Sequence, residues 1–310
     1  MLTVRLVSIH YAAPDVNVYM FRAPDGTALP PAPGGSHIDL HIDATTTRQY
    51  SLVNEGEAPD TYQIAVRRMP DGRGGSDRWH RESIVGETYT ISAPRCIFPV
   101  SPPPGMREIL LAGGIGITPM LSIWRARRRA GLKPHLYYWG PERGRMAFYH
   151  ELAGQDDVTL IETAHGMDQP RVSDIIRIHP GSHLFYACGP ERMIHEAEQA
   201  LGNSQQLLIE RFAPLGTVPS VQDNGYTVRL ARSGHDLHVL PGETILAACL
   251  RNNLDVAYSC EQGVCGACEI RVLKGRVNHR DALHQPGTER DVMMICCSEP
   301  ADASILELDL

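Results

Sequence analysis

Four cysteines near the end of the chain limit its possible structure more than any other feature of the sequence. Cys260, Cys265 and Cys268 follow the spacing C-x4-C-x2-C, and Cys296 comes 28 residues later. This spacing is typical of a plant-type [2Fe–2S] cluster, whose irons are held by soft thiolate ligands. The segment must therefore fold as a tight loop that directs several thiolates at one point.

The cysteine loop also contains Gly263 and Gly266, which permit tight turns and can direct N–H groups at cluster sulfurs. Buried thiols or structural zinc are alternatives, although zinc sites usually contain two closely spaced cysteine pairs or histidines. Cys296 and Cys297 are adjacent, and successive strand residues point to opposite faces, so only one should face the cluster. We expect this ligand to be Cys296. The predicted metal ligands are Cys260, Cys265, Cys268 and Cys296.

The composition argues against several classes of protein. With 29 Lys and Arg against 36 Asp and Glu, the formal net charge is −7, which argues against a nucleic-acid partner. No apolar run approaches the ~18–20 residues needed to cross a bilayer, so we expect no membrane partner. Residues 1–10 lack the basic and apolar regions of a signal peptide. We therefore expect a soluble, cytoplasmic chain whose eight cysteines are thiols or metal ligands rather than disulfides.

The pattern of short segments along the chain predicts three domains. Residues 1–103 contain short strand-like runs separated by turn signals, as in a small antiparallel barrel or sandwich. After a proline-rich connector, residues 104–223 alternate strand and helix patterns, which indicates a parallel α/β domain. Residues 224–310 begin with a hairpin and a helix, and the cysteine loop follows them.

A glycine-rich turn follows the first apolar strand of the predicted α/β domain and contains Gly113, Gly114 and Gly116. Thr118 and Pro119 suit the N-cap and the first position of a helix. Glycines let a pyrophosphate approach the backbone, and a helix N-terminus favours its negative charge. The turn is not the usual G-x-G-x-x-G fingerprint, so a turn that merely joins strand to helix is the alternative.

A second strand of this domain ends in Cys188, Gly189 and Pro190. Small residues at the carboxyl end of a parallel strand leave room for a flat ligand at the edge of the sheet. We therefore expect a nicotinamide beside these residues, with simple packing of a buried cysteine as the alternative.

Two short motifs in the first domain suit a flavin. An arginine can neutralise the flavin phosphate, and a tyrosine can stack on the ring system. A serine and backbone N–H groups at a helix start can bind the phosphate. The residues are Arg48, Tyr50 and Ser51 in the first motif, and Gly74, Gly75 and Ser76 in the second. Ordinary alternation of surface and core residues is the alternative for the first motif.

Taken in order, these motifs resemble those of the phthalate dioxygenase reductase family, which includes vanillate demethylase reductases. The similarity extends over nearly the whole chain, and the matching segments are residues 48–51, 73–76, 111–120, 186–190, 259–268 and 279–281. The resemblance implies an FMN-binding antiparallel β-barrel, an NADH-binding domain with a parallel α/β sheet, and a C-terminal β-grasp ferredoxin domain. It also implies that Cys296 is the last cluster ligand and that Glu210 and Phe212 lie near the flavin, as does Cys188.

The resemblance further implies that the electron acceptor is a terminal oxygenase, usually of the Rieske type. NADPH is an alternative to NADH, because Arg143 and Arg145 follow a predicted strand and could hold a 2′-phosphate. Exposed arginines in a solvated loop are the more common case, so we favour NADH.

A hydride carries two electrons and a [2Fe–2S] cluster accepts one, so a flavin is needed between them. No acid–base side chain is strictly required, and we predict no catalytic residue. Two other functions are consistent with parts of the pattern. The chain could be an electron carrier that binds no nicotinamide, or a reductase whose acceptor is a cytochrome P450 or a small ferredoxin.

Overall fold

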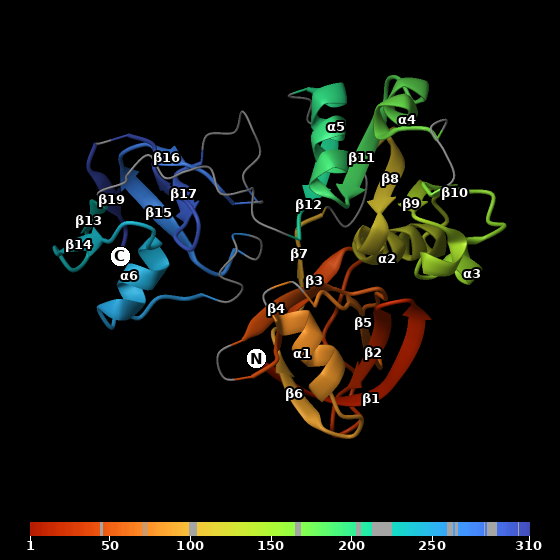
Figure 1. Cartoon of the computed structure of the whole chain (residues 1–310), viewed down its shortest axis with the longest axis horizontal. Helices are drawn as coiled ribbons and strands as arrows, with labels where there is room; N and C mark the ends of the chain where they lie inside the picture. Colours follow the sequence, from red (N-terminus) through yellow and green to blue (C-terminus); the bar gives the residue numbers. More distant parts are fainter. Residues whose placement is uncertain are drawn as a thin grey trace. The chain divides into compact units, whose positions relative to one another are not determined.

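The chain forms two compact units, residues 1–210 and residues 211–310 (Figure 1). This computed structural model describes residues 1–43, 46–70, 72, 74–98, 104–164, 169–202, 206–212, 225–258, 263, 266–281, 283, 290–302 and 304–310. Two sheets lie in the first unit, and the cysteine-rich segment belongs to the second. Each unit is described by itself.

The first sheet of the first unit is antiparallel, and helix α1 packs against it (Figure 1). Its main strand order is β4-β3-β6-β1-β2-β5, with β7 paired to β3. The residues that follow β4 pair with β5 through the bridge Leu52–Ile64, which closes the sheet into a barrel. The elements are β1 (Leu2–Ala13), β2 (Val16–Arg22), β3 (Ser36–His41), β4 (Thr47–Ser51), β5 (Tyr62–Arg67), α1 (Gly75–Glu82), β6 (Thr88–Ile91) and β7 (Arg95–Cys96).

Alternating apolar side chains fill the barrel, as expected for strands with one buried face. Trp79 of α1 is buried and contacts Tyr19 and Tyr89, with ring centroids 5.3 and 4.8 Å apart. The helix therefore covers the interior of the barrel with its largest side chain, which fixes the position of the α1 N-terminus.

The second sheet is parallel, with strand order β10-β9-β8-β11-β12. Its connections reverse direction between β8 and β11, so this is the switch point of a doubly wound sheet. The elements are β8 (Arg107–Gly113), η1 (Gly114–Gly116), α2 (Ile117–Arg129), β9 (His135–Gly140), η2 (Arg143–Arg145), α3 (Tyr149–Leu152), β10 (Val158–Glu162), α4 (Val172–Ile178), β11 (His183–Cys188), α5 (Glu191–Leu201) and β12 (Leu207–Glu210).

The two faces of the parallel sheet have separate cores, because successive strand residues point to opposite sides. Leu110 and Ala112 of β8 pack on the face that α2 and the barrel cover. Ile109 and Leu111 pack on the face that α4 and α5 cover. A buried ion pair between Glu108 and Arg127 of α2, 2.9 Å apart, links this helix to the first strand of the sheet.

The second unit contains a small mixed sheet with strand order β14-β13-β19-β15-β17. Strands β13 and β19 are parallel at its centre, and the outer pairs are antiparallel. Helix α6 packs on this sheet, and Thr244 caps it by accepting a 3.1 Å hydrogen bond from the Ala247 N–H. The elements are β13 (Tyr226–Leu230), β14 (Asp236–Val239), α6 (Ile245–Arg251), β15 (Glu269–Lys274), β16 (Val277–Asn278), β17 (Val292–Met294), β18 (Glu299–Pro300) and β19 (Leu306–Leu308).

The antiparallel barrel and the parallel α/β sheet follow each other in the order predicted from the sequence, and the last segment contains the mixed sheet and the two-stranded sheet β16–β18. The predicted domain limits, 1–103, 104–223 and 224–310, remain a prediction. Within the described ranges, each helix is too short or too polar to cross a bilayer.

Candidate functional site

The carboxyl ends of β8 and β11 form the edge of the parallel sheet at its switch point. Their register places Ala112 beside Cys188, so the glycine turn after β8 lies next to the Cys-Gly-Pro segment after β11. Crevices at such positions are where doubly wound sheets bind nucleotides. The structure thus brings together two motifs that lie about seventy residues apart in the sequence.

Glycines are required here because the two turns pack directly on each other. A Cβ on Gly116 would lie 2.2 Å from the carbonyl oxygen of Cys188, and one on Gly113 would lie 2.6 Å from the Pro190 ring. A Cβ on Gly189 would lie 3.0 Å from the Gly113 backbone. Since real Cβ atoms do not approach so closely, any larger residue would separate the strand ends.

Gly114 differs from these glycines. It has a positive φ of 55° and no atom near the direction in which a Cβ would point. It is therefore the glycine at which the turn is open to a ligand, immediately before the N-terminus of α2. A thirteen-residue helix presents partial positive charge there, which favours a phosphate.

The predicted capping pattern of this helix is wrong. Helix α2 begins at Ile117, directly after the η1 turn, so Thr118 is its second residue and Pro119 its third. The Thr118 hydroxyl donates a 3.0 Å hydrogen bond back to the Ile115 carbonyl instead of accepting one from the helix. Pro119 is still tolerated, because the first-turn N–H groups of a helix have no partner within the helix.

A carboxyl group lies where the barrel meets this edge of the sheet. Glu210 ends β12 beside Cys188, and Ser51 ends β4 of the barrel. The Ser51 hydroxyl donates a 3.1 Å hydrogen bond to Glu210 Oε1. One strand of the predicted flavin domain therefore contacts the carboxyl end of β12 in the predicted nucleotide domain.

Burial controls the protonation of this group. Glu210 is 4% exposed, and burial raises its pKa to about 8, although the Ser51 hydrogen bond opposes the shift. Its second oxygen, Oε2, is buried with no partner among the described residues. Burial, together with the Glu210 charge, also raises the pKa of the Cys188 thiol well above its ordinary value. Near neutral pH the site therefore holds a protonated carboxyl and a neutral thiol, with one carboxyl oxygen available to a ligand.

The two predicted flavin motifs also meet. The side chain of Arg48 lies against Gly75, where a Cβ would come within 2.5 Å of Arg48 Nε. Gly74 is the N-cap of α1, with a φ of 76° and open space beside it. The Ser76 hydroxyl accepts a 3.1 Å hydrogen bond from the Met69 N–H, which holds the loop before the helix. A guanidinium beside a glycine helix start fits the phosphate of a flavin.

Tyr50 lies on β4, two residues after Arg48, and packs against the barrel core. Burial raises the pKa of its phenol above the ordinary value, so the side chain stays neutral. A neutral aromatic side chain at this position is suited to stacking on a ring system. Phe212 is 40% exposed and belongs to the second unit, and its predicted place near the flavin stays a prediction.

Arg67 is a residue that the sequence analysis did not select. It ends β5, and that strand contacts the η1 turn. The charge of Arg67 also acts on the Tyr138 phenol of β9. The sequence signal that could have identified Arg67 is its position at the end of a strand-like run, a few residues before Gly74 and Gly75. Its location suits contact with an anionic ligand at the sheet edge.

The second unit contains part of the predicted cluster site. Cys268 and Cys296 are 3% and 5% exposed, and the Gly263 N–H donates a 3.1 Å hydrogen bond to Cys296 Sγ. Two other predicted ligands, Cys260 and Cys265, lie outside the described residues. A buried thiol that accepts a backbone N–H fits the donor set of an iron–sulfur cluster.

Cys296 and Cys297 do not lie on a strand, contrary to the prediction from the sequence. Residues 295–297 form a turn, in which the Cys297 N–H donates to the Met294 carbonyl at 3.2 Å. Both sulfurs consequently lie near Gly263, because a Cβ on this glycine would lie 2.4 Å from Cys297 Sγ. The hydrogen bond to Cys296 supports the original assignment, which stays a prediction.

The turn with Cys296 is held by the segment His279-Arg280-Asp281. The Arg280 N–H donates to Ser298 Oγ at 3.2 Å, and Ser298 Oγ donates to the buried carboxylate of Asp281 at 3.3 Å. Arg280 also forms an ion pair with Glu299. These contacts connect the turn of Cys296 to a segment that also lies beside Gly263, where a Cβ would come within 3.0 Å of Asp281 Cα.

Comparisons with known proteins agree with this geometry. Residues 228–301 match the family of 2Fe–2S iron–sulfur cluster binding domains. The phenoxybenzoate dioxygenase subunit beta of Ectopseudomonas oleovorans is 36% identical over 100% of this chain and 97% of its own length. The phthalate dioxygenase reductase of Burkholderia cepacia is 31% identical over 100% of this chain and 97% of its own.

Solved structures give the same result. A phthalate dioxygenase reductase, described as a modular structure for electron transfer from pyridine nucleotides to [2Fe–2S], superposes with a TM-score of 0.73. It is 30% identical, over 100% of this chain and 98% of that one. An intact type IV self-sufficient cytochrome P450 monooxygenase superposes with a TM-score of 0.87 at 32% identity, over 100% of this chain and 41% of that one.

The fold and the site define an oxidoreductase of the class that joins a flavin barrel and a pyridine-nucleotide sheet to a [2Fe–2S] domain. The chain belongs to the phthalate dioxygenase reductase family. The predicted fold class, including the C-terminal ferredoxin domain, is thereby confirmed.

Proposed function

We propose that this protein is the reductase component of a multicomponent oxygenase and passes electrons from NADH through FMN and a [2Fe–2S] cluster to a Rieske-type oxygenase. The contact that carries the proposal is the hydrogen bond from Ser51 of the barrel to Glu210 at the edge of the nucleotide sheet. It joins the flavin strand to the strand ends where a nicotinamide would lie, inside one compact unit.

The residues of the barrel would hold the flavin. Arg48 and the open α1 N-terminus at Gly74, Gly75 and Ser76 supply positive charge and N–H donors for a single phosphate. FMN ends in a single phosphate, which these groups could bind. Tyr50 would lie against the ring system, and the Ser51 hydroxyl is available at its edge.

The sheet edge would hold the nicotinamide nucleotide. Gly113, Gly116 and Gly189 keep the turns close together, and Gly114 leaves the backbone open to a pyrophosphate near Thr118 and Pro119 of α2. Cys188 and Pro190 would lie beside the nicotinamide at this edge. Glu162 at the carboxyl end of β10 places a carboxylate at this edge, which favours a ribose hydroxyl over a 2′-phosphate and therefore favours NADH.

When bound, the flavin accepts a hydride as an electron pair and releases electrons singly. Glu210 keeps a proton near neutral pH and can exchange it through the Ser51 hydroxyl or its free oxygen. Cys188 and Glu210 are buried and would help to keep water away from a nicotinamide bound at this edge. The proposed cluster ligands are Cys260, Cys265, Cys268 and Cys296, and the proposed domains are residues 1–103, 104–223 and 224–310.

A cytochrome P450 is the second candidate for the electron acceptor. The observation in its favour is the high TM-score with a self-sufficient P450, whose polypeptide includes a segment similar to the whole of this chain. This chain covers 97% of the length of two relatives that are named as dioxygenase components, as expected if it is a separate reductase subunit. This favours an oxygenase on a separate chain.

Anaerobic addition of NADH tests the proposal directly. We expect rapid bleaching of the flavin and cluster absorbance with NADH and much slower bleaching with NADPH. Subsequent mixing with an oxidised Rieske oxygenase should restore the colour as electrons leave. A protein whose visible spectrum does not change with either nucleotide would contradict the proposed function.

A further inference from the structure

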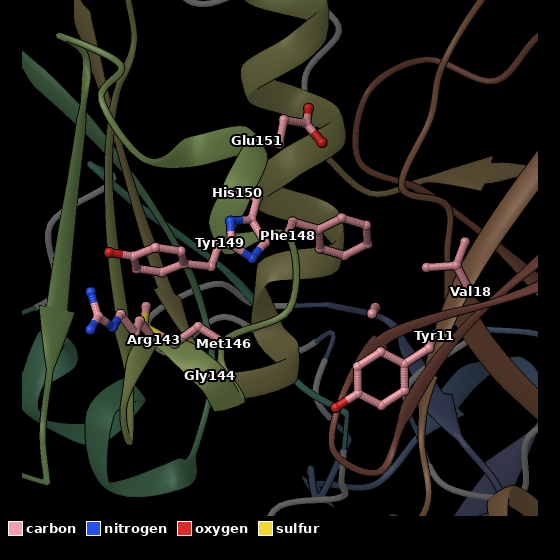
Figure 2. A pocket seen from close by; sticks show the side chains of 10 residues that line it. Tyr11, Val18, Arg143, Gly144, Met146, Phe148, Tyr149, His150 and Glu151 are labelled. Carbon is pink, nitrogen blue, oxygen red and sulfur yellow. The ribbon is translucent and has the colours of Figure 1, made fainter.

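A cavity of about 420 Å³ in the first unit has no part in the proposed electron path. It lies between the β1–β2 hairpin of the barrel and the segment from η2 to α3 that follows β9 (Figure 2). Its volume is in the range of small-molecule pockets. The lining residues are Tyr11, Ala12, Val18, Arg143, Gly144, Met146, Phe148, Tyr149, His150 and Glu151.

One end of the cavity is apolar and aromatic. Figure 2 shows Tyr11, Val18 and Phe148 together on the right of the view. Tyr11 is 74% exposed, and Val18 is buried. Phe148 has a φ of 63°, which is rare for a large side chain and must be maintained by its surroundings. Arg125 lies near it, with its guanidinium 6.0 Å from the Phe148 ring and paired with Glu151.

The other end is cationic. Figure 2 shows Arg143 and Tyr149 directed to the left of the view, away from the Tyr11 end. The backbone N–H of Arg143 is held by Glu162 at 3.0 Å, while its guanidinium has no partner in the described part of the chain. The carboxylate of Glu151 already pairs with Arg125 at 2.5 Å and so does not neutralise Arg143.

We propose that this cavity binds an elongated aryl carboxylate, with its rings between Tyr11 and Phe148 and its carboxylate on Arg143 and the Tyr149 hydroxyl. A single planar guanidinium suits the two oxygens of a carboxylate. The described part of the cavity offers neither a glycine loop nor a long helix N-terminus for phosphate groups, since α3 has four residues. A carboxylate is therefore favoured over a nucleotide.

Calorimetry on the flavin- and cluster-loaded protein tests this inference, with biphenyl-4-carboxylate as the probe and biphenyl-4-carboxamide and AMP as comparisons. We expect the acid to bind, and the amide and AMP to bind at least tenfold more weakly. Arg143→Ala should weaken binding of the acid roughly ten- to a hundredfold, as for loss of a charge-assisted pair. Tyr11→Ala should weaken it by about threefold or more.

Arg145→Ala is the matched control, because Arg145 is exposed on the same η2 turn but does not line the cavity. It should leave the affinity within about twofold. Thermal unfolding of each variant checks that the fold is retained. Absence of acid binding, or equal binding by Arg143→Ala and wild type, would overturn the inference.

Tighter binding of AMP than of the acid, with a raised KM for NADH in Arg143→Ala, would also overturn it and assign the cavity to the nucleotide. NADH oxidation is measured on the same samples. A protein that oxidises NADH normally but binds no acid would therefore refute the cavity proposal alone.

Discussion

Glu210 is a residue whose charge state depends strongly on the fold. Its pKa is about 8 in the folded chain, against an ordinary value of 4.5, because it is buried. Between these two pH values the unfolded chain has lost this proton and the folded chain has kept it, so stability falls as pH rises. Below about 4.5 and above about 8, this group contributes no further pH dependence.

Glu210→Gln should remove that dependence, since an amide has no proton to lose. We expect the variant to gain stability relative to wild type as pH rises from 5 to 8, by roughly 1 kcal/mol or more. Urea unfolding at a series of pH values measures the difference. Parallel curves for the two proteins would show that Glu210 titrates normally.

Substitution of each adjacent cysteine, Cys296 and Cys297, can show which of them is a cluster ligand. Cys296→Ser should abolish the cluster or change its visible spectrum, because serine replaces a thiolate ligand. Cys297→Ser should keep two irons per chain and a wild-type spectrum. Iron content and the EPR spectrum of the reduced protein check both variants. The reverse pattern would make Cys297 the ligand.

At the scale of residues, the sequence was informative where chemistry needs a fixed spacing. The cysteine loop is such a case, because its ligands are close in the chain. Glu210 is the opposite case, since its partner Ser51 lies 159 residues away and no local pattern marks it. Only the family resemblance indicated it. The turn at residues 295–297 also left no signal, because adjacent apolar and cysteine residues are equally typical of a strand.

At the scale of elements, the contact between the two turns at the sheet edge can be tested with one methyl group. In Gly116→Ala this group would lie 2.2 Å from the Cys188 carbonyl oxygen, and backbone on both sides prevents relaxation. We expect a KM for NADH raised at least tenfold and a stability loss of about 1–3 kcal/mol. Gly56→Ala is the control, because its nearest neighbour would be 3.5 Å away. Equal effects of both changes would contradict the packing role.

The attachment of α2 to the sheet depends on a buried ion pair. Glu108 and Arg127 are 3% and 5% exposed, and the Tyr186 hydroxyl also donates to Glu108 at 2.7 Å. Arg127→Ala should cost about 3–5 kcal/mol in the free energy of unfolding, because it leaves a buried carboxylate without its cation. Arg177→Ala, in an exposed pair with Asp174, should cost less than about 1 kcal/mol. Chemical denaturation compares the two, and similar losses would contradict the account.

Strands and helices with strong apolar patterns were predictable, and their boundaries were less so. The alternation of strands and helices in residues 104–223 was apparent from the sequence, whereas the start of α2 was predicted two residues late. The reason is that η1 continues directly into α2, so Thr118 never reaches a capping position. Capping residues therefore indicate that a helix begins nearby but do not fix its first residue.

At the scale of the whole molecule, the order of the domains along the chain differs from the order of electron flow, because electrons would pass from the nucleotide sheet back to the barrel that precedes it in the chain and then to the cluster domain. The barrel and the parallel sheet share one compact unit, as transfer of a hydride over a short distance requires. The residues that match the cluster-binding family belong to the second compact unit. The sequence could predict three domains from changes in pattern, but it could not show that two of them share a unit, since this depends on contacts such as Ser51–Glu210.

The central claim is that a flavin and a one-electron cluster are joined in one chain, and an anaerobic reductive titration tests it most directly. The wild-type protein should take up about three electrons per chain, two on the flavin and one on the cluster. The Cys268→Ser variant should take up about two and lose the EPR signal of the reduced cluster. Uptake of a single electron by wild type, or an unchanged EPR signal in the variant, would contradict the account.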